Sequence, residues 1–192
     1  RFMSSSHHVA AVASASARAV PLVHVPRAVS PIKIDAETEE KAWVQPPGPA
    51  RTGELLLENG KPARPHTEAR LVWSDDGLYM AVLASDEDIR SQDFLHVVIT
   101  RGGTDYAIDV YATGAVKTAV GGVQAVVDAD GVIDNPKGFD EEWNIEMLVP
   151  FASLGTKGEH GVTLGLALGR CDTPKTTGVE VCASLRDTLV LE

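Results

Sequence analysis

Tryptophan rings are the strongest candidates in this sequence for contact with a ligand. The chain has only three tryptophans, and aromatic residues make up 5% of it. Trp73 stands at the end of an alternating run, directly before the turn sequence Ser74–Gly77, where an exposed ring is expected more readily than inside a strand. Trp143 shares a strand face with Ile145 and Met147, which favours core packing, so it is the weaker candidate.

Two charged side chains, Arg170 and Glu146, stand inside strand-like runs where a charge is unexpected. Arg170 ends the apolar run that begins at Val162 and lies on the face of its leucines, while Glu146 lies on the face opposite Trp143. A charge in such a position either contacts a ligand or forms an ion pair at the rim of the fold. If the role is structural, Glu146 is the expected partner of Arg170.

Acidic residues gather in two short stretches. Asp86, Asp88 and Asp93 precede an apolar run, and their carboxylates are hard oxygen ligands of the kind that calcium takes. The second stretch, Asp128–Asp134, surrounds Gly131, but its spacing does not match the calcium loop of an EF-hand, and a hairpin turn explains it. Asp86, Asp88 and Asp93 are therefore the candidate calcium site, and no other cofactor is expected.

Catalysis is not expected from this sequence. It contains none of the motifs GxSxG, HExxH or paired-cysteine zinc spacing. Glu141 and Glu142 are adjacent, so on a strand they would point to opposite faces instead of acting as a carboxylate pair. We predict a protein without enzymatic activity.

The net charge of the chain argues against nucleic acid as a partner. Asp and Glu number 27 against 17 Lys and Arg, which gives a formal net charge of -10. Such a field repels phosphate backbones and anionic lipid. The sequence also lacks an apolar stretch of the roughly 18 residues that a membrane-spanning helix needs.

The two cysteines, Cys171 and Cys182, fall in a segment that predicts two strands and their connection. They can form a cross-strand disulfide or stay as two buried thiols, and the sequence leaves both open. A disulfide would imply an oxidising compartment, so that the chain would be extracellular, periplasmic or at the cell surface.

Short strands separated by glycine- and proline-containing turns account for most of the chain. They predict an all-β, two-sheet antiparallel sandwich, with one short helical turn over Asp35–Trp43 capped by Asp35. Residues 1–19, rich in Ser, Ala and His, are expected to be a flexible tail, leader remnant or tag, and 20–192 the sandwich domain. The predicted strands are 20–25, 67–73, 78–84, 94–100, 105–111, 115–120, 123–127, 143–149, 162–170, 179–185 and 188–191.

Several of these pieces, in this order, resemble the family 9 carbohydrate-binding modules. The family's Ile-Asp-Gly opening and following acidic turn and Trp are matched by Ile34–Trp43, with Ala36 in place of the glycine. Its Tyr after an acidic turn is matched by Tyr79, and its Trp-x-x-Glu strand and Leu-Gly corner by the segment from Trp143 to Gly155. The resemblance runs from about Ile32 to Leu191.

This resemblance implies a β-sandwich that binds a glycan or sugar terminus, with Trp73, Trp143, Glu146 and Arg170 as the residues expected at the ligand. Few aromatic residues are free to stack on a sugar. An interaction or assembly domain of an exported protein, which has lost sugar binding and takes a protein partner, therefore stays open as an alternative. A haem-binding relative is a further one, with His96 and Met80 as conceivable axial ligands.

Overall fold

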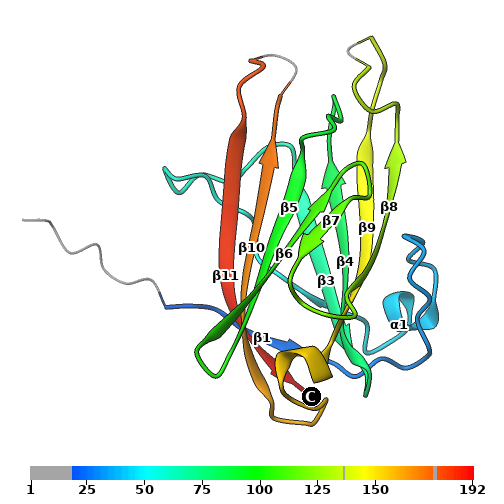
Figure 1. Ribbon diagram of the computed structural model, residues 1–192, viewed down its shortest axis with the longest axis vertical. Helices are drawn as coiled ribbons and strands as arrows, with labels where there is room; N and C mark the ends of the chain where they lie inside the picture. Colours follow the sequence, from blue (N-terminus) through cyan, green and yellow to red (C-terminus); the bar gives the residue numbers. More distant parts are fainter. Residues whose placement is uncertain (1–18, 136, 175–176) are drawn as a thin grey trace, which may run out of the picture.

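Two β-sheets pack face to face in the computed structural model, which describes residues 19–135, 137–174 and 177–192 (Figure 1). Sheet A has the spatial order β1 (Leu22–Val25), β11 (Val181–Leu191), β10 (Thr163–Asp172), β5 (Phe94–Arg101), β6 (Thr104–Tyr111) and β7 (Val116–Thr118). Sheet B has the order β2 (Ala50–Arg51), β3 (Thr67–Trp73), β4 (Gly77–Ser85), β9 (Glu142–Pro150) and β8 (Gln124–Asp130). Neighbouring strands are antiparallel except β1 and β11.

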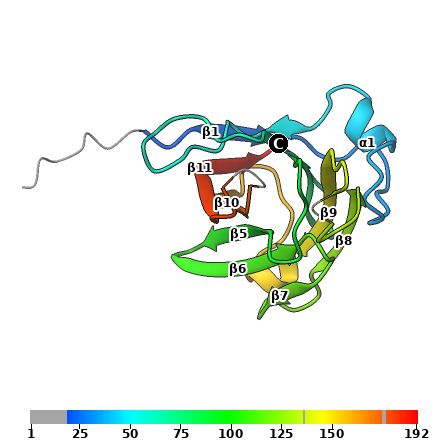
Figure 2. The same cartoon turned by 90° about the horizontal axis from the view of Figure 1, so that it is seen from above.

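The alternation of apolar residues along each strand produces the core between the sheets. In β5, for example, Leu95, Val97 and Ile99 are completely buried, whereas the residues between them are partly exposed. Seen from above, β11, β10, β5 and β6 lie on one side of this core and β8 and β9 on the other (Figure 2). The all-β sandwich predicted from the sequence is confirmed.

Two local predictions differ from the structure. The helix α1 is shorter than the predicted turn and covers Lys41–Val44, with Glu40 rather than Asp35 at its N-cap. The strand predicted to end at residue 185 and the one predicted to begin at 188 form a single strand, β11. The polar pair Arg186-Asp187 does not interrupt it, because Asp187 turns inward and accepts the backbone N–H of Gly53.

Residues 1–18 lie outside the described part of the chain, and so does nearly all of the predicted tail. Within the described residues, no helix is long and apolar enough to cross a membrane.

Candidate functional site

The four residues predicted to contact a ligand are buried. The exposed fractions are 3% for Trp73, 0% for Trp143, 0% for Glu146 and 4% for Arg170. A sugar stacks on an accessible ring face, which neither tryptophan provides. The prediction that these residues form a surface site is therefore corrected, and each has a structural role.

Trp73 is enclosed by segments that are remote from it in the sequence. Its ring packs edge-on against Phe151 at 6.5 Å between centroids, and the guanidinium of Arg27 lies 4.7 Å from the ring centroid. Its Nε1 donates to the backbone oxygen of Glu192 at 2.9 Å. The turn beside Trp73 does not expose the ring, because residues near both ends of the chain cover it.

Glu146 fastens the segment before α1 to the outer face of sheet B. Its carboxylate accepts the backbone N–H groups of Asp35 and Ala36 at 2.9 and 3.2 Å, and Nε1 of Trp43 at 2.8 Å. Burial raises the pKa of this carboxyl, while these donors act in the opposite direction. The expected ion pair between Glu146 and Arg170 is wrong, since the two side chains have different partners.

Arg170 lies inside the sandwich near one end. Its guanidinium donates to Ser85 O at 2.7 Å, to Thr67 Oγ1 at 3.2 Å and to Asp86 Oδ2 at 2.8 Å. Asp172 Oδ1 lies 3.6 Å from Nη2 of the same side chain. Arg170 is thus the internal cation of a group of buried carboxylates.

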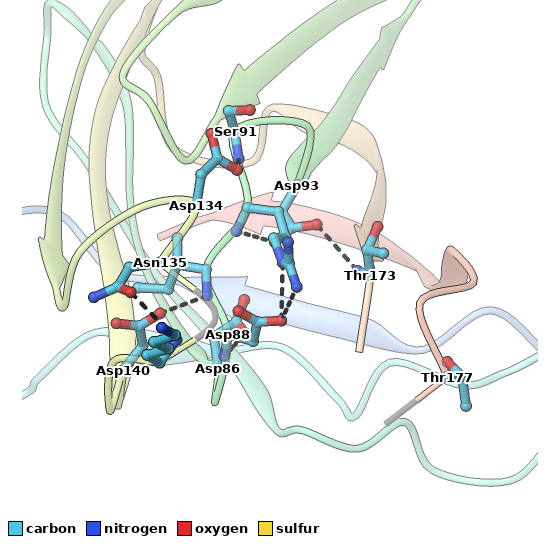
Figure 3. A network of polar contacts seen from close by, with 12 residues as sticks. Asp86, Asp88, Ser91, Asp93, Asp134, Asn135, Asp140, Thr173 and Thr177 are labelled. Carbon is cyan, nitrogen blue, oxygen red and sulfur yellow. Dashed lines mark hydrogen bonds and ion pairs between the residues drawn. The ribbon is translucent and has the colours of Figure 1, made fainter. Parts of the chain in front are cut away.

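That group contains two of the predicted calcium ligands, Asp86 and Asp93, together with Asp172. All three are buried, and one oxygen of each lies within 4.8 Å of the others. Asp93 accepts the backbone N–H groups of Arg90 at 2.7 Å and of Thr173 at 3.0 Å. Figure 3 shows Asp93 beside Thr173. We call Asp86, Asp93 and Asp172 the carboxylate cluster.

Burial changes the protonation of this cluster. It raises the pKa of Asp93 to about 6 and that of Asp172 to about 7, against the attraction of Arg170. Asp88, the third predicted ligand, instead binds the Arg90 side chain through Oδ2 at 2.8 Å. Asp86, Asp93 and Asp172 are thus one set of hard oxygen donors that could hold a cation. Oδ1 of Asp172 has no hydrogen-bond partner among the described residues.

A separate hollow of about 730 Å³ lies on the outer face of sheet A, and we call it the sheet A hollow. The connection between β2 and β3 passes beside the upper part of β11 (cyan in Figure 1) and borders the hollow. Leu56 in this connection exchanges two backbone hydrogen bonds with Ser184 of β11, each 2.9 Å long. Other lining residues are Phe94, His96, Asp109, Gly169 and the two cysteines.

The strand registers explain why these residues meet. Gly169 of β10 is paired with Ser184 of β11 on one side and with His96 of β5 on the other. His96 is paired in turn with Asp109 of β6, and its Nδ1 donates to Oδ1 of that residue at 2.5 Å. The result is a cross-strand row of polar side chains interrupted by a glycine without one.

A stack of rings supports one wall of the hollow. Phe94 and Tyr111 are cross-strand neighbours and stack at 5.4 Å between centroids. Nζ of Lys117 lies 4.3 Å from the centroid of Tyr111. Phe94 lines the hollow whereas Tyr111 does not, so Tyr111 backs Phe94 and holds its ring in place.

The predicted alternative of a disulfide is confirmed, since Cys171 and Cys182 are bonded. They are directly paired residues of β10 and β11, next to Phe94 in the same cross-strand row. The disulfide therefore forms part of the floor of the sheet A hollow.

The suggested haem ligands do not share a pocket. Met80 is completely buried between the sheets, whereas His96 lies on the outer face of sheet A and binds Asp109. They cannot serve as two axial ligands of one haem in this arrangement.

The sheet A hollow was not among the predicted sites, since none of the three tryptophans lines it. A signal was nevertheless present in β10, where leucines alternate with Gly165, Ala167 and Gly169. Such an alternation predicts one apolar face and one face almost free of side chains.

The fold is similar to solved structures of carbohydrate-binding proteins. A family 9 carbohydrate-binding module from Caldicellulosiruptor kristjanssonii in complex with cellotriose has a TM-score of 0.66 at 13% identity, over 89% of this chain and 93% of that one. A complex of such a module with glucose gives 0.60 at 13% identity, over 88% and 95%. A protein from Bacteroides uniformis that has been proposed to bind carbohydrate gives 0.63 at 13% identity, over 91% and 100%.

These similarities confirm the fold of a family 9 carbohydrate-binding module that was expected from the sequence. At 13% identity they establish the fold alone. No family model and no curated protein matches the sequence.

Proposed function

We propose that this chain is a non-catalytic carbohydrate-binding module and that it binds sugar in the sheet A hollow. The observation that carries the proposal is the combination, in one hollow, of the supported ring of Phe94 with the polar side chains of His96, Asp109 and Ser184. An aromatic face accepts the apolar side of a pyranose, and fixed polar groups accept or donate to its hydroxyls. The sugar complexes of proteins with this fold support the proposal.

Isothermal titration calorimetry with a panel of soluble oligosaccharides tests this function. Phe94→Ala should weaken binding about tenfold or more, because the ring contributes most of the apolar contact. Phe139→Ala is the matched control, since Phe139 is 99% exposed and does not line the hollow. Absence of binding to every sugar of a broad glycan array would overturn the proposal.

The second candidate function is an interaction domain that takes a protein partner. The connection between β8 and β9 favours this function, because Phe139 and Val132 in it are 99% and 61% exposed. Exposed apolar side chains of this kind are typical of protein contacts. This second function would be supported if the protein binds no sugar and if the Phe139→Ala variant no longer binds a protein partner that the parent binds.

We also propose that the chain is exported and that the carboxylate cluster takes up a calcium ion. The disulfide supports export, because such bonds persist in oxidising compartments. The buried oxygen set supports calcium, because the one positive charge of Arg170 faces three carboxylates. Calcium titration monitored by calorimetry, with Asp172→Asn as the variant that should lose binding, tests the second point.

A further inference from the structure

Beyond the sheet A hollow, which ends at Gly169 on β10, the outward face of this strand continues without large side chains. The small outward-facing residues of β10 are Cys171, Gly169, Ala167 and Gly165, in order away from the hollow, and Thr163 follows them at the start of the strand. Flanking them are larger side chains of β11 and β5, such as Arg186 and Val98 beside Ala167. We call the four β10 residues the β10 lane.

The glycine at position 169 is not required by the fold. Its φ angle does not fall in the left-handed region, and an added Cβ would meet its nearest atoms at 3.6 Å or more, which is an ordinary contact. Gly165 is different, because a Cβ there would approach Thr100 Cβ at 3.0 Å. The missing side chain at Gly169, between Ser184 and His96, thus keeps the lane open without any benefit to packing.

The dimensions of the β10 lane fit a chain of sugars better than a single one. From Cys171 to Gly165 it extends about 20 Å at the rise of an antiparallel strand, which exceeds the length of a disaccharide. Cys182 at one end and Thr163 beyond the other end are exposed, so among the described residues no buried wall closes either end. A ligand in the lane can therefore continue past both ends.

The chemistry of this surface selects against two other ligand classes. The backbone of β10 is paired on both sides, with β11 and with β5, so no free edge is available for an added peptide strand. The hollow contains Glu58 and Asp109, and the chain carries a formal net charge of -10. An acidic polysaccharide would be repelled, whereas a neutral one is not.

We infer that the β10 lane binds the interior of a linear, neutral polysaccharide, with the sugar chain running along β10 and one ring seated against Phe94. This inference rests on the proposed sugar-binding function and specifies its ligand. It differs from recognition of a sugar terminus, which needs a closed end.

Calorimetry with neutral linear oligosaccharides of increasing length tests the inference on the unmodified protein. We expect the affinity to rise about tenfold or more from the disaccharide to the hexasaccharide of the same linkage, as more of the lane is filled. Reduction of the terminal sugar of the hexasaccharide to an alditol should leave its affinity unchanged within about twofold.

Two outcomes separate this inference from the proposed function. If glucose or a disaccharide binds as tightly as the hexasaccharide, or if the alditol no longer binds, the chain binds sugar but not the interior of a polysaccharide. If no oligosaccharide binds at all, the proposed function fails as well.

Variants that fill the lane give an independent test. Gly169→Val should weaken hexasaccharide binding about tenfold, and Gly169→Ala by a smaller factor, with melting curves that confirm folding. Gly121→Val is the control, because this glycine is exposed, lies between β7 and β8 and has no left-handed φ. Unchanged hexasaccharide affinity in a folded Gly169→Val would overturn the inference.

Discussion

The backbone at Ala36 is in a conformation that suits glycine. Its φ is 68°, in the left-handed region, where a Cβ costs roughly 1–2 kcal/mol. Glu146 holds it there by accepting its N–H. Ala36→Gly should therefore raise the free energy of unfolding by about 0.5–1 kcal/mol, after the greater freedom of glycine in the unfolded chain is subtracted.

Urea unfolding followed by circular dichroism measures this change. Ala42→Gly is the control, because Ala42 is also buried but lies in the helix α1, where glycine should destabilise. A loss of stability in Ala36→Gly would show that the left-handed backbone does not limit stability here.

Removal of the Glu146 carboxylate should be far more costly. Glu146→Ala leaves three N–H donors, two of them buried, without an acceptor, at a cost of about 3 kcal/mol. Glu146→Gln retains one carbonyl oxygen and should lose less. The Trp43 fluorescence should shift to the red in Glu146→Ala if the segment detaches, and an unshifted spectrum with unchanged stability would contradict this role.

The strands were predictable from the sequence to the extent that their pattern is local. Alternating apolar residues and turn glycines indicate β3 and β4, or β5 and β6, as hairpins, and the structure pairs them so. The pairing of β10 with β5 joins segments that are far apart in the sequence. This pairing places Gly169 beside His96 and creates the hollow, and no local pattern contains it.

The predictions for Trp73 and Arg170 were wrong for the same reason, namely contacts between segments that are far apart in the sequence. Trp73 was expected to be exposed because a turn follows it, yet Arg27 and Glu192, from distant parts of the chain, enclose it. Arg170 was correctly recognised as an unusual charge, but its partners are brought together only at the end of the sandwich. Local sequence patterns do not show which side chains are buried by segments that are remote in the sequence.

The disulfide between Cys171 and Cys182 closes the loop that joins β10 to β11, and it should stabilise the folded protein. Closing a loop of this size contributes about 3 kcal/mol in the chain-entropy model. The double variant Cys171→Ser, Cys182→Ser should lose about this amount in urea unfolding. Since both cysteines also form the floor of the hollow, sugar affinity should fall with it, and a variant equal to the parent in both properties would contradict the assigned role.

The stability of the whole molecule should depend on pH through the carboxylate cluster. Burial raises the pKa values of Asp93 and Asp172 to about 6 and about 7, so the folded state holds protons that the unfolded chain has released above about pH 4. Stability from these groups is therefore complete below that pH and is lost as the pH rises through 6 to 7. Asp86 and Arg170 face the same cluster and form an ion pair at 2.8 Å.

Thermal unfolding in the presence of EDTA should accordingly give a lower melting temperature at pH 8 than at pH 5. Calcium should raise it at pH 8, where the carboxylates are ionised, and have little effect at pH 5, because binding must displace protons. Asp172→Asn should reduce both the pH dependence and the calcium effect, whereas Asp128→Asn, at an exposed position of β8, should change neither. A melting temperature in EDTA that rises from pH 5 to pH 8 would show that the cluster does not control the stability of the sandwich, and an equal calcium effect at both pH values would place the ion elsewhere.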